Sequence, residues 1–551
     1  MRRLTTAWVL LVLLWAAPAW GAGLFTPDTG IVAAGRAGAF VATANDGLAL
    51  YYNPAGLHLM NGLQLRGGLM GLQNPVTFRR GGGEGRYKLD DNGDYLIDGT
   101  GGPDVGGPFT EVSNQDSFRP IPEYSLSYGF EDPDLTIAMG LYAPLAPWIS
   151  YPLYGANRYR LTKLRLIQGN FALGLGWRLP APLDFIAIGG SFQIIYISMK
   201  QDFWASSDIE NLDVDVNPEH PQWDTLTQFE AQQWQPSWNA GLMIIPHHTM
   251  RIGLSFSPQY TFRGSGSASL SGELGGEYLE QIGEEYGQFL ELAGIDLDTS
   301  PLNLMGVDDD ITVTTKQPAI LRAGVMVEPT SWLNLELAGT IDFWSRADAI
   351  VGSDVEVPLQ DCDENGDCQP IVDEIKGRTD PIDPCVGGDG VELVECGSLD
   401  TYKGTDGEGS FRLPQGWKNA YSIRFGGEIQ PIPDRLGIRF GYAFESSAIP
   451  DATLNLTMFD SNKHMVGVGV SGRFEGFEIH FSYAHIFYTP RTITAEVAEG
   501  THIGLEATVV GDIDDGDYSG SADIIGLALG LDFTTLHRNA KAKKASASRI
   551  Y

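Results

Sequence analysis

The sequence predicts an all-β transmembrane fold: an antiparallel outer-membrane β-barrel of about fourteen strands, with an N-terminal hatch inside its lumen. Three observations lead to this prediction. Short segments in which apolar residues alternate with other residues recur along the whole chain. The connections between these segments alternate between tight turns and long loops. An export signal is followed by no apolar stretch long enough to cross a membrane as a helix.

Residues 1–21 have the features of a secretory signal peptide. Two arginines precede an apolar run, and the small residues Ala19 and Gly21 stand where a cleavage site requires them. The run has about 11 residues, whereas a spanning helix needs about 20. We therefore expect the mature chain to begin at Ala22 and to enter a membrane only as strands.

Fourteen segments have the alternation typical of strands with one face in lipid. Examples are "LTIAMGLY" from Leu135, "FALGLGWRL" from Phe171 and "MVGVGVSGRF" from Met465. Most contain about 10 to 16 residues, enough to cross a bilayer as tilted strands. They begin near residues 62, 122, 135, 164, 184, 235, 250, 312, 332, 419, 436, 463, 477 and 523. The last, "DIIGLALGLDF", ends at Phe533 with alternating apolar residues, as terminal barrel strands usually do.

The lengths of the connections predict which ends of the strands lie together. Those after the even-numbered strands are tight turns: "EDPD", "PAPL", "PHHT", "EPTS", "PIPD" and "EG". Those after the odd-numbered strands are mostly long, notably residues 73–121, 204–234, 264–311, 346–418 and 490–522. This is the pattern of an outer-membrane barrel with short periplasmic turns and long external loops. A soluble β-sandwich also has short alternating strands, but its loops do not sort by length in this way.

No linker or change of composition divides residues 61–533, so we expect one barrel domain followed by a basic tail, residues 534–551. The tail is expected to be disordered. The formal net charge of the whole chain is -34. This charge disfavours nucleic acid and anionic membrane surfaces as partners.

Four cysteines, Cys362, Cys368, Cys385 and Cys396, lie close together in one predicted external loop. In an exported protein they predict two disulfides, with three possible connectivities.

The segment "DCDENGDC" in the same loop resembles the start of a calcium-binding loop. Candidate ligands are Asp361, Asp363, Asn365 and Asp367. The twelfth position is Val372 instead of glutamate, so the match is incomplete. Residues 354–400 carry 14 acidic residues, which would suit divalent ions that bridge to anionic lipopolysaccharide. The alternative is a solvated acidic loop without a bound ion.

The stretch "GLALYYNPAGLHLM", residues 47–60, is apolar but is broken by glycine and proline. A fourteen-stranded barrel encloses a wide lumen that is either a pore or plugged. Residues 22–60 precede the first strand and are available as the plug, because irregular backbone is tolerated at membrane depth where protein surrounds it. Pro54 fixes its own φ, and the side chain of Asn53 can bond nearby backbone groups.

The chain also resembles the FadL/TodX family of outer-membrane transporters for long-chain fatty acids and aromatic hydrocarbons. The matching motifs are "AGLF" from Ala22, "GRAGAFVATANDGLALYYNPAGL" from Gly35, "WNAGL" from Trp238, "WKNAYSIRFGGEI" from Trp417 and "GYAFESSAIP" from Gly441. They cover nearly the whole mature chain in the family's order. The resemblance implies uptake of hydrophobic molecules across the outer membrane of a Gram-negative bacterium. It also implies a hatch with the motif Asn53, Pro54 and Ala55, capture on external loops, a tighter internal site and lateral exit.

Several residues are candidates for substrate binding. The resemblance places Leu24 and Phe25 in the internal pocket and matches Lys418 to a basic position before "NAY". Ser198 stands where family members have an arginine, although Lys200 follows it. That departure weakens the case for a carboxylate ligand and favours a neutral hydrocarbon. For either lysine, a strand-end position at the membrane interface is the alternative.

The external segment 274–292, "LGGEYLEQIGEEYGQFLEL", has apolar residues at helical spacing, including Tyr278, Ile282 and Phe289. We expect a groove that captures an amphiphile; the alternative is a loop helix that packs on its neighbours. A lateral gate is expected on the third strand, where the resemblance places a kink. Its candidates are Gly140, Pro144 and Pro147, since proline has no N–H and glycine allows bends.

The sequence contains no zinc motif and no nucleophile elbow, so we expect a transporter that is not an enzyme and has no cofactor except possible calcium. Two other functions stay open: an outer-membrane lipid hydrolase with a Ser/His site on its outer wall, and a general diffusion porin. The expected partners are a hydrophobic small molecule, outer-membrane lipid and lipopolysaccharide, and the barrel assembly machinery during insertion.

Overall fold

The computed structural model describes residues 29–81, 88, 90, 96, 109–115, 118–206, 224–274, 302–347, 349–353, 360–362, 368–370, 411–414, 416–457, 459–494 and 513–539. No helix among these residues has the length and apolar character needed to span a membrane.

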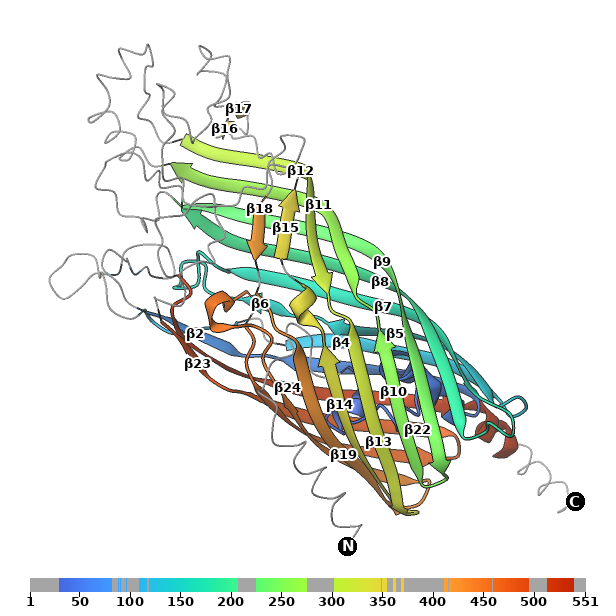
Figure 1. Cartoon of the computed structure of the whole chain (residues 1–551). Coiled ribbons are helices and arrows are strands. Elements are labelled where there is room, and N and C mark those ends of the chain that lie inside the picture. The colour runs from blue at the N-terminus through green and yellow to red at the C-terminus, as the bar shows by residue number, and fades with distance from the viewer. Residues whose placement is uncertain are drawn as a thin grey trace, which may run out of the picture.

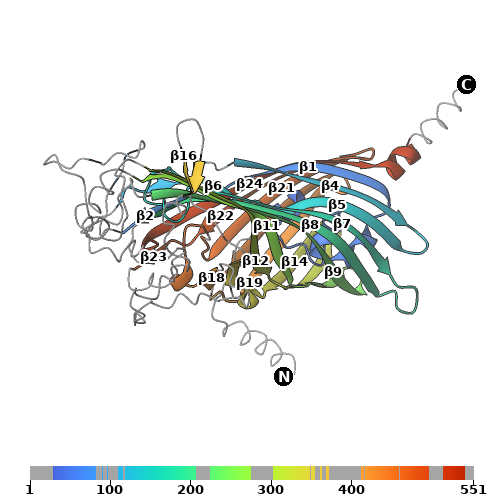
Figure 2. The same ribbon diagram turned by 90° about the horizontal axis from the view of Figure 1, so that it is seen from above.

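Fourteen passes of the chain form one closed antiparallel sheet, which confirms the predicted barrel (Figures 1 and 2). In chain order they are β1 (Gly62–Gln73), β4 (Phe118–Phe130), β5 (Leu135–Leu145), β7 (Lys163–Arg178), β8 (Ile186–Ser206), β9 (Asp224–His247), β10 with β11 (Met250–Ser257 and Tyr260–Leu274), β12 with β13 (Leu302–Gln317 and Ile320–Thr330), β14 (Leu333–Asp342), β19 (Ala420–Ile432), β20 (Leu436–Glu445), β21 (Lys463–Phe474), β22 (Phe477–Tyr488) and β24 (Gly516–Asp532). The first and last strands close the sheet, with pairs from Gln64 opposite Asp532 to Gln73 opposite Asp523. A closed sheet rules out the sandwich.

The wall is apolar outside and polar inside, the reverse of a soluble barrel. On β4 the outward side chains of Tyr124, Leu126 and Tyr128 are exposed, whereas the intervening Ser125 and Ser127 are buried toward the lumen. Lipid covers the outward face of such a strand and the lumen receives the polar one. The alternation in the sequence therefore arises because one face of each strand lies in lipid and the other faces the polar lumen.

The tight turns gather at one end of the barrel, called here the turn end, and the long connections at the other, the loop end (Figures 1 and 2). Shorter strands extend the wall at the loop end: β2 (Val76–Arg80), β3 (Val112–Ser113), β6 (Trp148–Ser150), β15 (Ala349–Ser353), β16 (Gln360–Cys362), β17 (Cys368–Pro370), β18 (Phe411–Pro414) and β23 (Arg491–Ile493). Two short 3-10 helices, η3 (Trp344–Arg346) and η5 (Asp451–Thr453), also lie there.

Four strands start earlier than the sequence predicts. β4, β9, β12 and β24 begin at Phe118, Asp224, Leu302 and Gly516, instead of near 122, 235, 312 and 523. Their added parts, such as "DTLTQFEAQQW" from Asp224, are rich in polar residues. Backbone pairing continues past the apolar band, where side-chain alternation no longer marks it.

The end of the chain also differs from expectation. The sequence predicts disorder from residue 534, but residues 533–539 are helical. Asp532 caps this helix by accepting the backbone N–H of Thr535 at 3.0 Å, and the Thr534 hydroxyl accepts the N–H of Leu63 at 3.2 Å. The tail therefore begins as an ordered extension of the turn end.

Candidate functional site

Residues 29–60 lie inside the barrel and form the structure that we call the hatch. It contains α2 (Ile31–Ala34), α3 (Ala49–Tyr52) and the 3-10 helix η1 (Pro54–Leu59). Nearly every hatch residue is buried, and Asn45 is the one exposed member. Since the wall supplies partners for backbone that such short helices cannot satisfy alone, an irregular segment is stable here.

The motif Asn53, Pro54 and Ala55 forms the centre of the hatch. Asn53 is fully buried and caps η1, because its side-chain oxygen accepts the N–H of Ala55 at 3.2 Å. Its amide group donates to the carbonyl of Val41 at 3.0 Å and to that of Leu242, on β9, at 3.3 Å. Asn53 thus joins two parts of the hatch to the barrel wall.

A row of glycines lets the wall approach this motif. Gly176, Gly189 and Gly241 stand directly opposite one another on β7, β8 and β9. A Cβ atom on Gly189 would lie 2.3 Å from the Ala55 nitrogen, and one on Gly241 would lie 2.2 Å from the Asn53 Oδ1 atom. Hatch backbone therefore packs directly against wall backbone at Gly189, and the Asn53 side chain packs against the wall at Gly241.

Glu336, on β14, holds another part of the hatch. Its carboxylate accepts the backbone N–H groups of Val41 at 2.6 Å, Ala42 at 2.9 Å and Thr43 at 2.9 Å. All four residues are buried. The three successive N–H groups would otherwise have no acceptor within the hatch, so Glu336 completes its backbone hydrogen bonding.

We expect Glu336→Ala to loosen this part of the hatch while the barrel stays folded. Each buried N–H left unsatisfied costs about 1 to 3 kcal/mol. Amide hydrogen exchange at residues 41–43 should accelerate about tenfold or more, as measured by mass spectrometry. Glu328→Ala, which alters a carboxylate on the adjacent strand without hatch backbone bonds, is the matched control. Unchanged exchange in Glu336→Ala would show that the clamp is dispensable.

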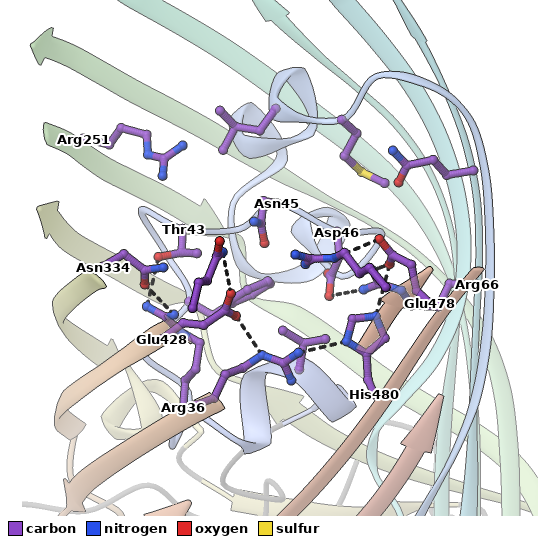
Figure 3. Close-up of a pocket in the computed structure, with 18 of the residues that line it drawn as sticks. Arg36, Thr43, Asn45, Asp46, Arg66, Arg251, Asn334, Glu428, Glu478 and His480 are labelled. Atoms are coloured by element: carbon purple, nitrogen blue, oxygen red, sulfur yellow. Dashed lines mark hydrogen bonds and ion pairs between the residues drawn. The ribbon is translucent and has the colours of Figure 1, made fainter. Parts of the chain in front are cut away.

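A polar cavity of about 220 Å³ separates the hatch from the turn end of the wall (Figure 3). Five arginines and four carboxylates line it, together with His480: Arg36, Arg66, Arg251, Arg439, Arg473, Asp46, Glu328, Glu428 and Glu478. Arg66 bridges Asp46 of the hatch at 2.7 Å and Glu478 of β22 at 3.0 Å. Arg439 pairs with Glu428 at 3.0 Å and donates to the Nδ1 atom of His480 at 2.9 Å.

These pairs make the turn end a poor route for an apolar molecule. An apolar molecule offers these charged groups no hydrogen-bond partners in exchange for the contacts it would displace. Arg36 adds a hydrogen bond to Asn334 at 2.7 Å, so the hatch is tied to the wall on two sides of the cavity. Passage straight through the barrel would have to disrupt several of these contacts together.

The lumen on the loop-end side of the hatch has one apolar wall. A buried cluster there contains Leu145, Leu166, Ile195, Ile197, Ala231, Phe262, Ala268, Ile311 and Val313. Below it, side-chain hydrogen bonds run from Tyr260 through Gln168, Asn170 and Gln193 to Ser191, whose hydroxyl donates to the carbonyl of Leu50 in the hatch. The polar inward groups of this wall thus satisfy one another and leave its upper part apolar.

Backbone pairing between β4 and β5 stops partway up the wall. β4 pairs with β1 from Phe118 to Gly129, but its pairing with β5 stops at Tyr124, which stands opposite Leu141. Beyond that point β5 bulges against β7 between Tyr142 and Leu145. The wall closes again where the N–H of Gln115 donates to the carbonyl of Ser150 at 2.7 Å. Among the described residues, the facing stretches 118–123 and 142–148 share no ladder pair, and we call this opening in the ladder the window.

Both edges of the window carry proline, which has no N–H to donate. Pro120 and Pro122 lie on β4, Pro144 lies near the end of β5, and Pro147 follows β5. Because β4 keeps its ladder with β1, its missing donors are best accommodated on the side of β5.

The side chain of Arg119 crosses the window. Arg119 donates to the carbonyl of Trp148 at 3.0 Å, and its guanidinium carbon lies 3.7 Å from the centre of the Trp148 ring. Arg165 lies 5.3 Å from the same ring. At the window, side-chain contacts replace the backbone ladder that closes the rest of the barrel.

The structure assigns the gate candidates different places. Pro144 and Pro147 lie at the window, but Gly140 is in the intact ladder below it, opposite Ser125. A Cβ atom on Gly140 would lie 3.0 Å from the side chain of Leu50, so this glycine makes room for the hatch.

The two candidate lysines lie at different places, and neither is buried in the lumen. Lys200 lies on the face of β8 opposite to the buried Ile195 and Ile197, and its ammonium group is 3.7 Å from Glu230, with both side chains about half exposed. The expectation for Lys200 is therefore corrected: a strand alternates faces, and this residue has the outward parity. Lys418 is exposed beside the buried Trp417 at the loop end.

Other candidates lie outside the described residues. They include the signal peptide, Leu24 and Phe25, the side chains of Tyr278, Ile282 and Phe289, the cysteines Cys385 and Cys396, and the calcium candidates Asp363, Asn365 and Asp367. The backbone places Cys362 opposite Cys368 in the pair of β16 and β17, with Asp361 beside them. No group of three potential metal ligands occurs in the part of the chain that the structure describes.

Three features of the site were not predicted: the charged residue Glu336 on β14, the charged residue Arg322 on β13, and the prolines of β4 at the window. Glu336 and Arg322 are charged residues at inward positions of otherwise apolar strands, in "LNLELAG" and "ILRAGV". Charge at such a position is a recognisable signal, since ionisable residues inside membrane proteins are usually functional. The prolines of "RPIPEY" on β4 are a second recognisable signal, because proline within a strand removes a donor from the ladder.

Comparisons with known proteins agree with this geometry. Residues 12–533 match the family model described as outer membrane protein transport protein (OMPP1/FadL/TodX). Comparison with curated proteins gives no significant match. Among solved structures, the Pseudomonas aeruginosa FadL homologue has a TM-score of 0.64 at 15% identity, covering 93% of this chain and 100% of its own. The Ralstonia pickettii toluene transporter TbuX (0.52, 14%, 91% and 98%) and the Pseudomonas putida toluene transporter TodX (0.51, 13%, 93% and 97%) share the fold.

Proposed function

Because the chain belongs to the OMPP1/FadL/TodX family of outer-membrane transport proteins, we propose that it takes up long-chain fatty acids or hydrocarbons by loop capture, internal binding, hatch rearrangement and lateral exit. The protein is an outer-membrane transporter of hydrophobic compounds and not an enzyme. The observation that carries the proposed route is a lumen plugged by the hatch beside a wall with a window.

Lateral exit follows from a comparison of the two routes out of the lumen. The straight route meets the polar cavity and its ion pairs. The window leads instead to the outward face of the wall, where an apolar molecule keeps about 0.8 kcal/mol for each CH₂ group that stays out of water. It is bordered by Leu145, a member of the apolar cluster. An apolar path therefore reaches the window without crossing the cavity.

Capture is assigned to the external segment 274–292. Replacing Tyr278, Ile282 and Phe289 together with serine would remove apolar contacts worth roughly 1.5 to 3 kcal/mol for each fully buried side chain. We expect uptake at limiting substrate to fall while the thermal stability of the barrel is retained. Lower stability with unchanged uptake per folded protein would make these residues structural.

A general diffusion porin is the second candidate function, and the hatch disfavours it. The hatch packs directly against the wall at Gly189 and Gly241, which leaves no water-filled path along that side.

For the acidic loop we keep the calcium proposal: divalent ions at Asp361, Asp363, Asn365 and Asp367 would bridge to lipopolysaccharide. Disulfides among the four cysteines would hold the loop. Contact with the barrel assembly machinery during insertion is expected of any such barrel.

Uptake by cells that lack their own transporter tests the function. Expression of this chain should confer uptake of a long-chain fatty acid or of toluene, the substrate named for two of the structural relatives. Mass spectrometry of molecules that copurify in mild detergent would identify the class. Equal permeability to small hydrophilic solutes with and without substrate would favour the porin.

A further inference from the structure

Arg322 is a buried cation with few partners. It lies on β13 at an inward position, two residues toward the loop end from Gly324, where a Cβ atom would meet the hatch at Val41 and Ala42. Only 4% of Arg322 is exposed. Its single hydrogen bond is a long one, to the Ser257 hydroxyl at 3.4 Å, and within the described residues it has no ion pair.

Other inward cations of the same region have strong partners. Arg424 contacts Glu445 at 2.7 Å, and Lys463 contacts the same carboxylate at 3.3 Å. Asp342 lies on β14, two residues beyond Thr340, the residue that stands opposite Arg322. It makes no ion pair with Arg322, and its Oδ1 atom lacks a hydrogen-bond partner. A guanidinium carries five N–H donors, so Arg322 can donate to an acceptor that enters the lumen.

Aromatic rings of the hatch define where Arg322 lies. Its guanidinium carbon is 4.5 Å from the centre of the Tyr51 ring and 6.0 Å from that of Tyr52. Tyr51 in turn contacts Tyr142 edge to face, with ring centres 5.6 Å apart. Arg322 therefore sits on the loop-end surface of the hatch, next to the strand that borders the window.

We propose that Arg322 binds an oxygen-bearing head group of the substrate on top of the hatch, so that the protein selects amphiphiles over pure hydrocarbons. This inference rests on the proposed function and names its substrate class. The donors of Arg322 suit a head group that accepts hydrogen bonds, and the apolar cluster suits its chain. The tail of such a ligand would extend toward Leu145 at the window.

A purely structural role is the rival explanation. Stacking on Tyr51 alone would make Arg322 a brace for the hatch, and its loss would then weaken every ligand equally. The two roles separate when ligands share a chain and differ only in the head group.

The experiment measures binding of hexadecanoic acid, hexadecanol and hexadecane to purified full-length protein and to Arg322→Met. We expect the variant to lose affinity for the acid by on the order of 10- to 100-fold and for the alcohol by less, with hexadecane unchanged. Arg322→Lys should restore part of the acid affinity. Lys200→Met, which removes an outward cation, is the matched control and should bind as wild type.

Equal loss for all three ligands, or no loss for any, would overturn the proposal in favour of a structural Arg322. Selectivity of the wild-type protein for hexadecane would overturn it as well. Wild-type protein that binds and transports none of the three ligands nor toluene would instead refute the proposed function itself.

Discussion

Replacing Gly189 with valine is expected to unseat the hatch and turn the plugged barrel into a conducting pore. The new Cβ atom would lie 2.3 Å from both the Ala55 nitrogen and the Pro54 carbonyl carbon. These are backbone atoms of the hatch and cannot move aside as a flexible side chain could. Overpacking of this kind costs about 1 to 3 kcal/mol or more, and the hatch, being held by side-chain contacts, gives way before the laddered wall.

Single-channel recording in planar bilayers measures the result. Wild-type protein should show little conductance, Gly189→Val should show large and frequent openings, and deletion of residues 22–60 should set the upper limit. Gly190→Val is the matched control, because a Cβ atom at the next position of β8 meets only the Asn239 carbonyl, at 3.8 Å. Equal conductance in both valine variants, or in wild type and the deletion, would show that the hatch does not seal the lumen.

A disulfide across the window is expected to stop uptake. If the register of Tyr124 opposite Leu141 continued, Pro122 would stand opposite Ala143, so Pro122→Cys with Ala143→Cys places one thiol on each edge. The variant is made in a background in which the four native cysteines are serine. Oxidation should reduce uptake to the level of cells without the protein, and reduction should restore it, because the bond holds shut the opening through which substrate leaves.

The control is a second pair in the intact ladder below. Leu126→Cys and Met139→Cys join residues that are already opposite each other, so oxidation should leave uptake unchanged. Mass spectrometry must confirm both disulfides. Full uptake with a confirmed bond across the window would eliminate lateral exit there and leave an axial path past a displaced hatch.

The barrel wall could be predicted from the sequence because a single physical constraint shapes every strand. Lipid on one face and a polar lumen on the other impose the alternation seen at Tyr124, Ser125 and Leu126. A strand that finishes at the turn end is followed by a tight turn, and a strand that finishes at the loop end is followed by a long connection. The prediction weakened where lipid no longer acts, as in the polar first part of β9.

The site was less predictable because it depends on which side chains meet across distant strands. Lys200 was predicted as a ligand because it follows Ser198, but both residues lie on the face of β8 opposite to the inward Ile195 and Ile197. The acceptors for the hatch backbone come from Glu336, almost 300 residues away, and no local pattern connects the two. Arg322 was visible only as an odd charge in an apolar strand.

The seam between β1 and β24 has a consequence for biogenesis. Pairing of Gln64 with Asp532 joins nearly opposite ends of the chain, a contact of very high sequence separation that forms slowly. Ile31 of the hatch lies across that seam, where Cβ atoms on Gly68 of β1 and Gly526 of β24 would come within 2.5 Å and 2.7 Å of it. The packing of Ile31 against both strands can therefore be completed only when the last strand arrives. Closure of the cylinder and completion of this part of the hatch packing thus depend on the same final pairing.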